Sequence, residues 1–203
     1  MGTVPSPPIM PDEAFLTFWR SHYGDCPPVG YLLRESFPER WLRIHNLPDA
    51  KRYAETAREL VTVLTRQNAV ATDLLGADSP AVLVASPSHT PVLVRPARGE
   101  RQYSRLRLEP LMLIIESDPG DPKGGWSIPL SSVHIHWHSG ALDDVLADVA
   151  NDLLKPFAIV SEINAHVYAP YDGGADLILA SEAERDEYRE KYAAWLSPHP
   201  SGL

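Results

Sequence analysis

Three histidines, His134, His136 and His138, alternate with apolar residues in the sequence VHIHWH. Successive side chains of a β-strand point to opposite faces, so a strand here would place all three imidazoles on one face. Two imidazoles whose Cα atoms lie about 6.6 Å apart can converge on one Zn²⁺. The first and third histidines would start about 13 Å apart, so a metal ion would use one adjacent pair and take further ligands from another strand.

The further ligands would come from the later part of the chain, where His166, Asp172 and Asp176 are the candidates. An open coordination position on such a metal would suit hydrolysis, with Asp176 or Glu162 as the base. The simpler interpretation is a strand with one buried and one wet face, and a pH-sensitive histidine cluster is a third. The predicted site for a divalent metal such as zinc consists of His134, His136, His166 and Asp176.

A second group of residues, in the segment RIHNLPDAKRY, forms a positive island in an acidic chain. The predicted anion-binding residues are Arg43, His45, Lys51 and Arg52. Backbone amides at the start of a helix, next to the last two cations, could hold a phosphate or carboxylate. No glycine-rich phosphate loop of the GxxxxGK[ST] or GxGxxG type accompanies them. The alternative is that the cations pair with nearby acids.

An aspartate in an apolar strand marks the third group. Asp176 lies in the sequence ADLIL, where a carboxylate needs a cation such as Arg43 or Lys51, or a metal. Asp172 and the two glycines after it predict a tight hairpin turn, in which the glycines would adopt positive φ. Nucleophilic catalysis has little support, because GxSxG is absent and Cys26 lies next to two prolines rather than at a helix start.

The hydrophobic pattern predicts the elements that must position these residues. Apolar residues at three- and four-residue steps favour helices, and short β-branched runs bounded by proline, glycine and serine favour strands. The segment 26–39, with three prolines, is expected to be irregular, and 117–125 is expected to be an exposed loop. Helices are expected at 11–24, 49–75 with Asp49 as the cap, 142–155 and 181–196. Strands are expected at 41–47, 81–87, 91–96, 103–117, 125–140, 158–171 and 175–181.

Composition limits the class of protein. A chain of 203 residues with 44% hydrophobic residues fits one globular domain, here residues 12–203 after a disordered proline-rich leader at 1–11. A net charge of −9 argues against a nucleic-acid partner. The apolar stretches are far shorter than the roughly 20 residues of a membrane span. A single cysteine favours a reducing, cytoplasmic compartment.

Three strings in the sequence carry a family resemblance. They are RIHNLPDAKRY, NAHVYAPYDGGADLIL and the ending EKYAAWLSPHPSGL. Together they resemble a family of uncharacterised bacterial proteins with a similar arginine, histidine, LP and KRY segment, a YDGGAD hairpin and a terminal tryptophan helix closed by HPSGL. The resemblance covers residues 18–203 and implies a bacterial cytosolic protein. It transfers no catalytic residue, because the family carries no established activity.

The order of the expected elements favours a single α+β domain with helices packed on a largely antiparallel sheet. For function we expect a non-enzymatic binding or interaction protein, such as an immunity-like protein, whose acidic surface takes a basic protein partner. This hypothesis predicts one contiguous acidic patch on helices 142–154 and 181–196. The alternative is a metal-dependent hydrolase built on the histidine strand. No cofactor other than a divalent metal, no nucleic acid and no membrane is expected, and the sequence does not indicate an oligomeric state.

Overall fold

The computed structural model describes residues 12–86, 105–118 and 121–197, which form a single α+β domain. One antiparallel sheet of seven strands has the order β1-β7-β6-β5-β2-β4-β3. The strands are β1 (Trp41–His45), β2 (Ser79–Ala85), β3 (Glu109–Asp118), β4 (Asp121–Trp137), β5 (Phe157–Val160), β6 (Val167–Tyr171) and β7 (Gly174–Ile178). The helices are α1 (Glu13–Tyr23), α2 (Gly30–Ser36), α3 (Ala57–Leu75), α5 (Asp143–Ala150) and α6 (Glu182–Lys191). The expected fold class is confirmed, while the leader at 1–11 and the strand at 91–96 lie outside the described residues.

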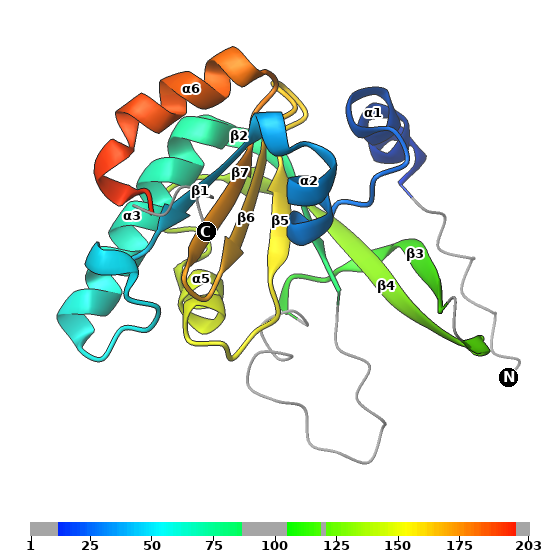
Figure 1. Cartoon of the computed structure of the whole chain (residues 1–203), viewed down its shortest axis with the longest axis horizontal. Helices are drawn as coiled ribbons and strands as arrows, with labels where there is room; N and C mark the ends of the chain where they lie inside the picture. Colours follow the sequence, from blue (N-terminus) through cyan, green and yellow to red (C-terminus); the bar gives the residue numbers. More distant parts are fainter. Residues whose placement is uncertain (1–11, 87–104, 119–120, 198–203) are drawn as a thin grey trace, which may run out of the picture.

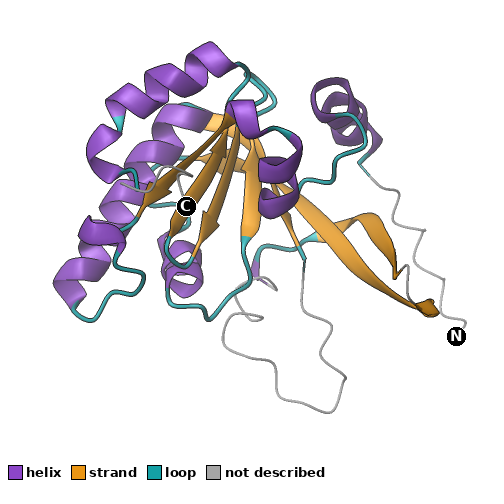
Figure 2. Ribbon diagram, viewed as in Figure 1, coloured by secondary structure: helices purple, strands orange, loops and turns teal. Residues whose placement is uncertain are grey.

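Helices cover both faces of the sheet, which gives the domain two cores (Figures 1 and 2). One core packs α3, α5 and the end of α6 against the sheet, and the other packs α1 and α2 against the opposite face. Strand β1 contributes to both. Leu42 and Ile44 lie in the core formed with α3 and α5, called the α3 core, and Trp41 packs against the core formed with α1 and α2, called the α2 core. Strand alternation therefore places Arg43 and His45 on the α2 side as well.

The hairpin of β6 and β7 pairs with β1 and so brings candidate residues of the two segments together. In the register of the sheet, Arg43 lies opposite Asp176 and His45 lies opposite Gly174. The expectation that the two hairpin glycines adopt positive φ is wrong, because Gly173 and Gly174 are not among the positive-φ residues. Close approach explains Gly174 instead, since a Cβ there would lie 1.9 Å from the carbonyl oxygen of Ile44.

Helix α3 begins eight residues later than expected. Asp49 has φ 55° and Ala50 has φ 53°, a left-handed backbone that cannot continue into an α-helix. The cap is Thr56, whose side chain accepts from the backbone N–H of Glu59 while the Glu59 carboxylate accepts from the backbone of Thr56. This reciprocal capping box, rather than Asp49, satisfies the first amides of α3.

The segment expected to be irregular contains α2. Its first residue, Gly30, packs so closely on β6 that an added Cβ would lie 3.0 Å from the Cβ of Ala169. Leu33 is fully buried in the α2 core. Packing on the sheet therefore stabilises a seven-residue helix directly after the prolines, where local preferences alone indicate a loop.

Three other boundaries differ from the expectation. Helix α5 ends at Ala150, before a turn in which Asp152 has φ 52°. The strand expected at 158–171 is two strands, β5 and β6, separated by a turn in which Ala165 has φ 56°. Strand β4 already begins at Asp121, inside the segment expected to be a loop. Among the described residues, no helix is both long and apolar enough to cross a membrane.

Candidate functional site

A buried ion pair joins β1 to β7. Arg43 donates from Nε to Oδ1 of Asp176 over 2.8 Å and from Nη2 to Oδ2 over 2.9 Å. Trp41 donates from Nε1 to the same Oδ1 over 2.8 Å. The two charged side chains are only 13% and 8% exposed. Arg43 is thus the cation partner of Asp176, one of the alternatives that the sequence left open.

The aromatic residues around this pair fix the guanidinium plane. The guanidinium carbon of Arg43 lies 4.4 Å from the ring centre of Tyr171 and 5.6 Å from that of Trp41. Burial lowers the pKa of Arg43, but the hydrogen bonds and charge of Asp176 outweigh it and raise the pKa overall. Burial raises the pKa of Tyr171 to about 12, so its phenol is neutral at physiological pH. Arg43 therefore stays charged and is held by Asp176 and the two aromatic rings. These four residues, Arg43, Asp176, Trp41 and Tyr171, are called the platform below.

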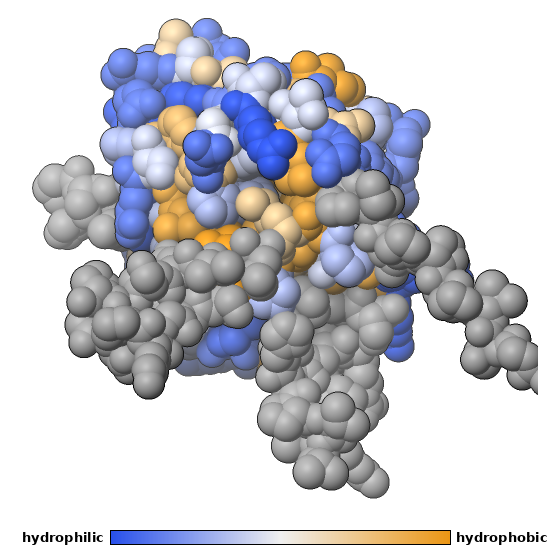
Figure 3. Space-filling view, turned by 90° about the vertical axis from the view of Figure 1, so that its right-hand side faces the viewer, coloured by the Kyte–Doolittle hydropathy of each residue, from blue (hydrophilic) through white to orange (hydrophobic). Residues whose placement is uncertain are grey.

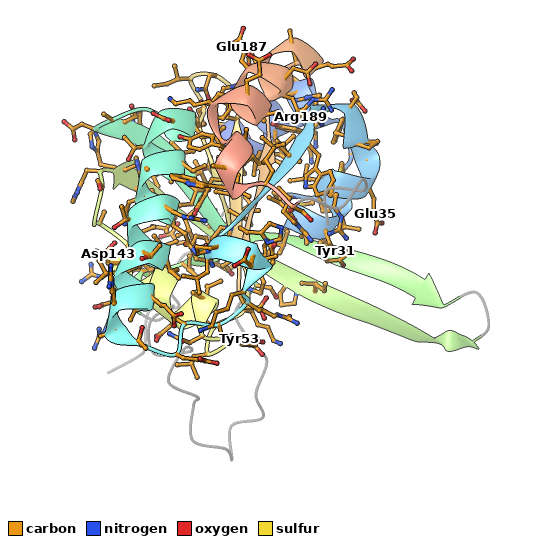
Figure 4. The ribbon with its side chains drawn as sticks, turned by 60° about the vertical axis from the view of Figure 1, so that its left-hand side comes forward. Tyr31, Glu35, Tyr53, Asp143, Glu187 and Arg189 are labelled. Atoms are coloured by element: carbon orange, nitrogen blue, oxygen red, sulfur yellow. The ribbon has the colours of Figure 1, made fainter. Side chains whose placement is uncertain are left out.

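A cavity of about 560 Å³ lies beside this platform, between α2 and the sheet. Pocket volumes for small organic ligands run from about 300 to 1,000 Å³. Most of its walls are apolar, from Val29, Val84, Ile128, Leu130 and Phe157. Figure 3 shows hydrophobic surface among hydrophilic side chains on the side of the β3–β4 hairpin, and Figure 4 shows Tyr31 on α2 close to that hairpin. The cavity therefore has the size and lining of a ligand pocket.

In the described part of the cavity lining, positively charged side chains outnumber negatively charged ones. Among the described residues, Arg34, Arg43 and Lys155 line the cavity, against one carboxylate, that of Asp176. Arg34 lies in the last turn of α2, where its guanidinium carbon is 5.9 Å from the ring centre of Trp41. The described part of the lining thus carries more cations than anions, in a chain whose net charge is −9.

The predicted anion-binding residues do not share one open surface. Of the four, Arg43 alone lines the cavity. His45 is buried, and burial and the neighbouring Arg43 lower its pKa. Lys51 contacts two glutamate carboxylates at 3.0 and 2.7 Å, and Arg52 contacts Asp172 at 2.6 Å. Helix α3 starts at Ala57, and Lys51 lies against its first turn through Glu59, so the anion site at these amides stays a prediction that the acid pairs do not favour.

The three strand histidines contact separate partners. His134 and His136 are exposed on one face of β4, as the alternation predicts, and His138 follows the end of the strand. Nε2 of His134 lies 2.5 Å from Asp12, the cap of α1. Nδ1 of His136 lies 3.0 Å from Asp78. His134 and His136 are therefore next to different carboxylates, whereas Nδ1 of His138 contacts the backbone carbonyl oxygen of Ser139.

The remaining predicted metal ligands lie elsewhere. His166 contacts the carbonyl of Leu74 at 3.0 Å and the carboxylate of Glu184 at 2.7 Å, and Asp176 contacts Arg43. Glu162 lies 3.8 Å from His134. Within the described ranges, no three or more histidine, cysteine, aspartate or glutamate side chains are grouped so that they could hold a metal ion. The metal site stays a prediction that these contacts do not favour.

The acidic helices present two surfaces rather than one. Helix α3 lies between α5 and α6, and Figure 4 shows Asp143, at the start of α5, far from Glu187 on α6. Several acids of α6 contact cations of the same helix: Arg185 bonds to Glu182 at 2.9 Å and to Asp186 at 2.7 Å. Asp143 and Glu187 thus lie far apart, and the contiguous acidic patch across both helices stays a prediction that this arrangement does not favour.

Sequence reasoning missed two cations of the cavity, Arg34 and Lys155. Arg34 is in the segment expected to be irregular, and Lys155 was placed at the end of a helix. They meet Arg43 at one cavity only through the pairing of β5, β6, β7 and β1. The nearest sequence signal was Asp176, a carboxylate in an apolar strand, which marked one wall of this cavity.

Comparisons with known proteins give a family without a function. No curated protein and no solved structure matches the chain. The profile of a domain of unknown function, DUF3885, matches residues 29–200, which include the cavity, the ion pair and the hairpin. The expectation of an uncharacterised family is thereby confirmed, and the chain belongs to the DUF3885 family.

Proposed function

We propose that this chain is a non-enzymatic binding protein whose ligand site is the cavity between α2 and the sheet. The observation that carries the proposal is a cavity of about 560 Å³ with mostly apolar walls and a few charged side chains in its lining. Such a combination lets apolar contacts supply affinity and a few polar groups fix orientation. The ligand class is therefore a small organic molecule.

The polar groups of the cavity support binding rather than catalysis. A general acid or base works best with a pKa near the operating pH. Tyr171 has its pKa raised to about 12, and both carboxylate oxygens of Asp176 accept hydrogen bonds. Cys26 does not line the cavity, and burial raises the pKa of its thiol, which disfavours the reactive thiolate.

The proposal is tested with a neutral apolar probe, N-phenyl-1-naphthylamine, whose fluorescence rises in apolar surroundings. We expect saturable binding of one probe per chain. Ser86 lines the cavity at the end of β2, and Ser86→Trp should fill part of it and weaken binding about tenfold or more. Ala183→Trp, on the exposed side of α6, is the matched control and should bind like the original chain. Absence of saturable binding, or equal loss in both variants, would overturn the proposal.

Three finer assignments are part of the proposal. A bacterial source is supported by the resemblance of the three strings, and a cytosolic location by that resemblance and the single cysteine.

A basic protein partner is supported by the net charge of −9 and by Glu187 and Glu190, which are exposed on α6. Reversing both charges to lysine should slow association with such a partner, measured by surface plasmon resonance at low salt. Unchanged association rates would count against this surface.

A further inference from the structure

We infer that the exposed side of α3 is an interface at which two copies of this chain pair, with their α3 helices antiparallel. An open groove of about 620 Å³ lies there, between α3 and the turn before α5. Figure 4 shows Asp143, at the end of that turn, beside α3. Because α3 and α2 pack on opposite faces of the sheet, the inference is independent of the cavity and of the proposed function.

The first argument is the apolar floor of the groove. Its described floor includes Val61, Leu64, Thr65 and Ala69, and the side chain of Val61 belongs to a residue that is 63% exposed. Thr65 donates its hydroxyl to the carbonyl oxygen of Val61 over 2.8 Å, so this hydroxyl requires no hydrogen bond from a partner. An apolar surface can therefore cover the floor.

The second argument is that polar side chains of the groove are bonded within the chain. Asn68 donates to the carboxylate of Asp143 over 2.7 Å and accepts from the backbone N–H of Gly140 over 2.7 Å. The hydroxyl of Thr72 accepts from Nε1 of Trp137 over 3.2 Å. Covering these groups leaves no donor or acceptor of this network unpaired, so their burial carries a small penalty.

The third argument is the charge at the two ends of the groove. Arg58 is exposed one turn before Val61, and the neighbouring acids Glu55 and Glu59 pair with Lys51 instead. A cation in the first turn of a helix is unfavourably placed relative to the helix dipole. An anion from a partner surface would compensate Arg58.

Asp73 lies at the other end of the groove and supplies that anion. Its two contacts, from the hydroxyl of Tyr192 and from Nζ of Lys191, are both at Oδ2. The side chain is 35% exposed, so Oδ1 can accept from a further cation. As an anion in the last turn of α3, it too opposes the helix dipole.

An antiparallel pair of α3 helices joins these two charges. With a twofold axis at Thr65, Arg58 faces Thr72 of the second copy and so comes next to Asp73 there. Within one helix the two charged residues are about 22 Å apart, so a parallel pair would place like charges together. The surface is thus self-complementary, as an isologous dimer interface must be.

Sedimentation velocity of the full chain, from about 1 to 200 μM, tests the dimer. We expect reversible dimerisation. Thr65→Asp places two carboxylates at the axis and should raise the dissociation constant about tenfold or more. Thr17→Asp is the matched control, because Thr17 is an exposed threonine of α1 that also donates to a carbonyl four residues earlier, over 2.8 Å. This variant should dimerise like the original chain.

A charge reversal tests the pairing of the ends. Arg58→Glu turns the attraction to Asp73 into repulsion and should raise the dissociation constant about tenfold. Arg20→Glu makes the same change at an exposed arginine of α1 and should leave it unaltered. Circular dichroism checks that each variant is folded.

Cysteine cross-linking tests the antiparallel register in a Cys26→Ser background. Thr65→Cys should give a disulfide-linked dimer on mild oxidation, because the two copies of this position meet at the axis. Arg58→Cys should not, because its two copies would lie about 21 Å apart along the helices.

Three results would overturn the inference. A chain that stays monomeric over the whole concentration range excludes the dimer. A dimer that Thr65→Asp and Thr17→Asp weaken equally, or not at all, forms at another surface. Equal cross-linking of Thr65→Cys and Arg58→Cys contradicts the antiparallel arrangement.

Discussion

Replacing Arg43 by methionine removes the cation of the buried pair and keeps much of the side-chain volume. Asp176, whose side chain is 8% exposed, would then keep only the hydrogen bond from Trp41. Breaking a buried pair by removing one partner costs about 3 to 5 kcal/mol, because the other charge is left buried without compensation. We expect Arg43→Met to lower the free energy of unfolding by about this amount.

The assay is urea unfolding at pH 7, followed by far-ultraviolet circular dichroism, with Arg43→Met, Asp176→Leu and the double variant compared. The double variant should be about 2 kcal/mol more stable than Arg43→Met, because the uncompensated charge is gone and only the Trp41 N–H lacks an acceptor. Lys51→Met, which removes two solvent-accessible ion pairs, is the control and should cause a much smaller loss.

Two results would refute this reasoning. A loss below about 1 kcal/mol for Arg43→Met would mean that Asp176 finds water or another donor, so that the pair is not effectively buried. A double variant as unstable as Arg43→Met would mean that packing of the arginine stem and Tyr171, rather than the charge of Asp176, dominates the loss.

Three further predictions test the frame around the site. Gly174→Ala should prevent stable folding or cost several kcal/mol in thermal unfolding, because its Cβ would lie 1.9 Å from the carbonyl oxygen of Ile44; a variant of unchanged Tm would contradict the close approach. Burial raises the pKa of Asp172, but its hydrogen bonds and the charge of its cation partner lower it overall, so its stabilisation is present above about pH 4 and is lost as the pH falls through the depressed pKa. Asp172→Asn should therefore reduce the difference in stability between pH 6 and pH 2, measured by urea unfolding, and an unaltered difference would argue against the pair. Because the strand histidines contact separate carboxylates, His134→Ala with His136→Ala should leave the metal content unchanged in inductively coupled plasma mass spectrometry, whereas stoichiometric zinc lost in that variant would establish the metal hypothesis instead.

Local patterns predicted most of the secondary structure. The short helix ending at Gly24, the strand from Trp41 and the hairpin around the two glycines follow from periodicity and turn residues within a few positions. The sequence SEAE at 181–184 also predicts a capping box. Its first half formed, with the Ser181 side chain accepting from the N–H of Glu184. The expected return bond from Glu184 to Ser181 did not form, because that carboxylate accepts from Ala180 and contacts His166. A pattern of a few residues thus predicts the local hydrogen bonds correctly unless one of its side chains bonds to a residue outside the segment.

The site itself could be predicted only in part, for the same reason. Asp176 in an apolar strand indicated a buried cation partner, and Arg43 was one of the two named. The register of β1 with β7, which decides between Arg43 and Lys51, depends on pairing across more than 130 residues. Alternation likewise placed His134 and His136 on one face, but the carboxylates they meet belong to α1 and the turn before β2.

A buried ion pair is a weak source of stability, because well-packed apolar residues of similar volume often stabilise a fold as much or more. The position of Arg43 and Asp176 beside a cavity therefore favours a role in binding over a role in folding. The double variant Arg43→Met, Asp176→Leu separates the two roles, since it removes the charge of the platform without leaving a buried ion. We expect it to stay folded and to bind N-phenyl-1-naphthylamine about threefold or more tightly, because two charged side chains of the cavity lining become apolar. If the affinity for the probe is unchanged, the pair does not contact the ligand and serves the sheet alone.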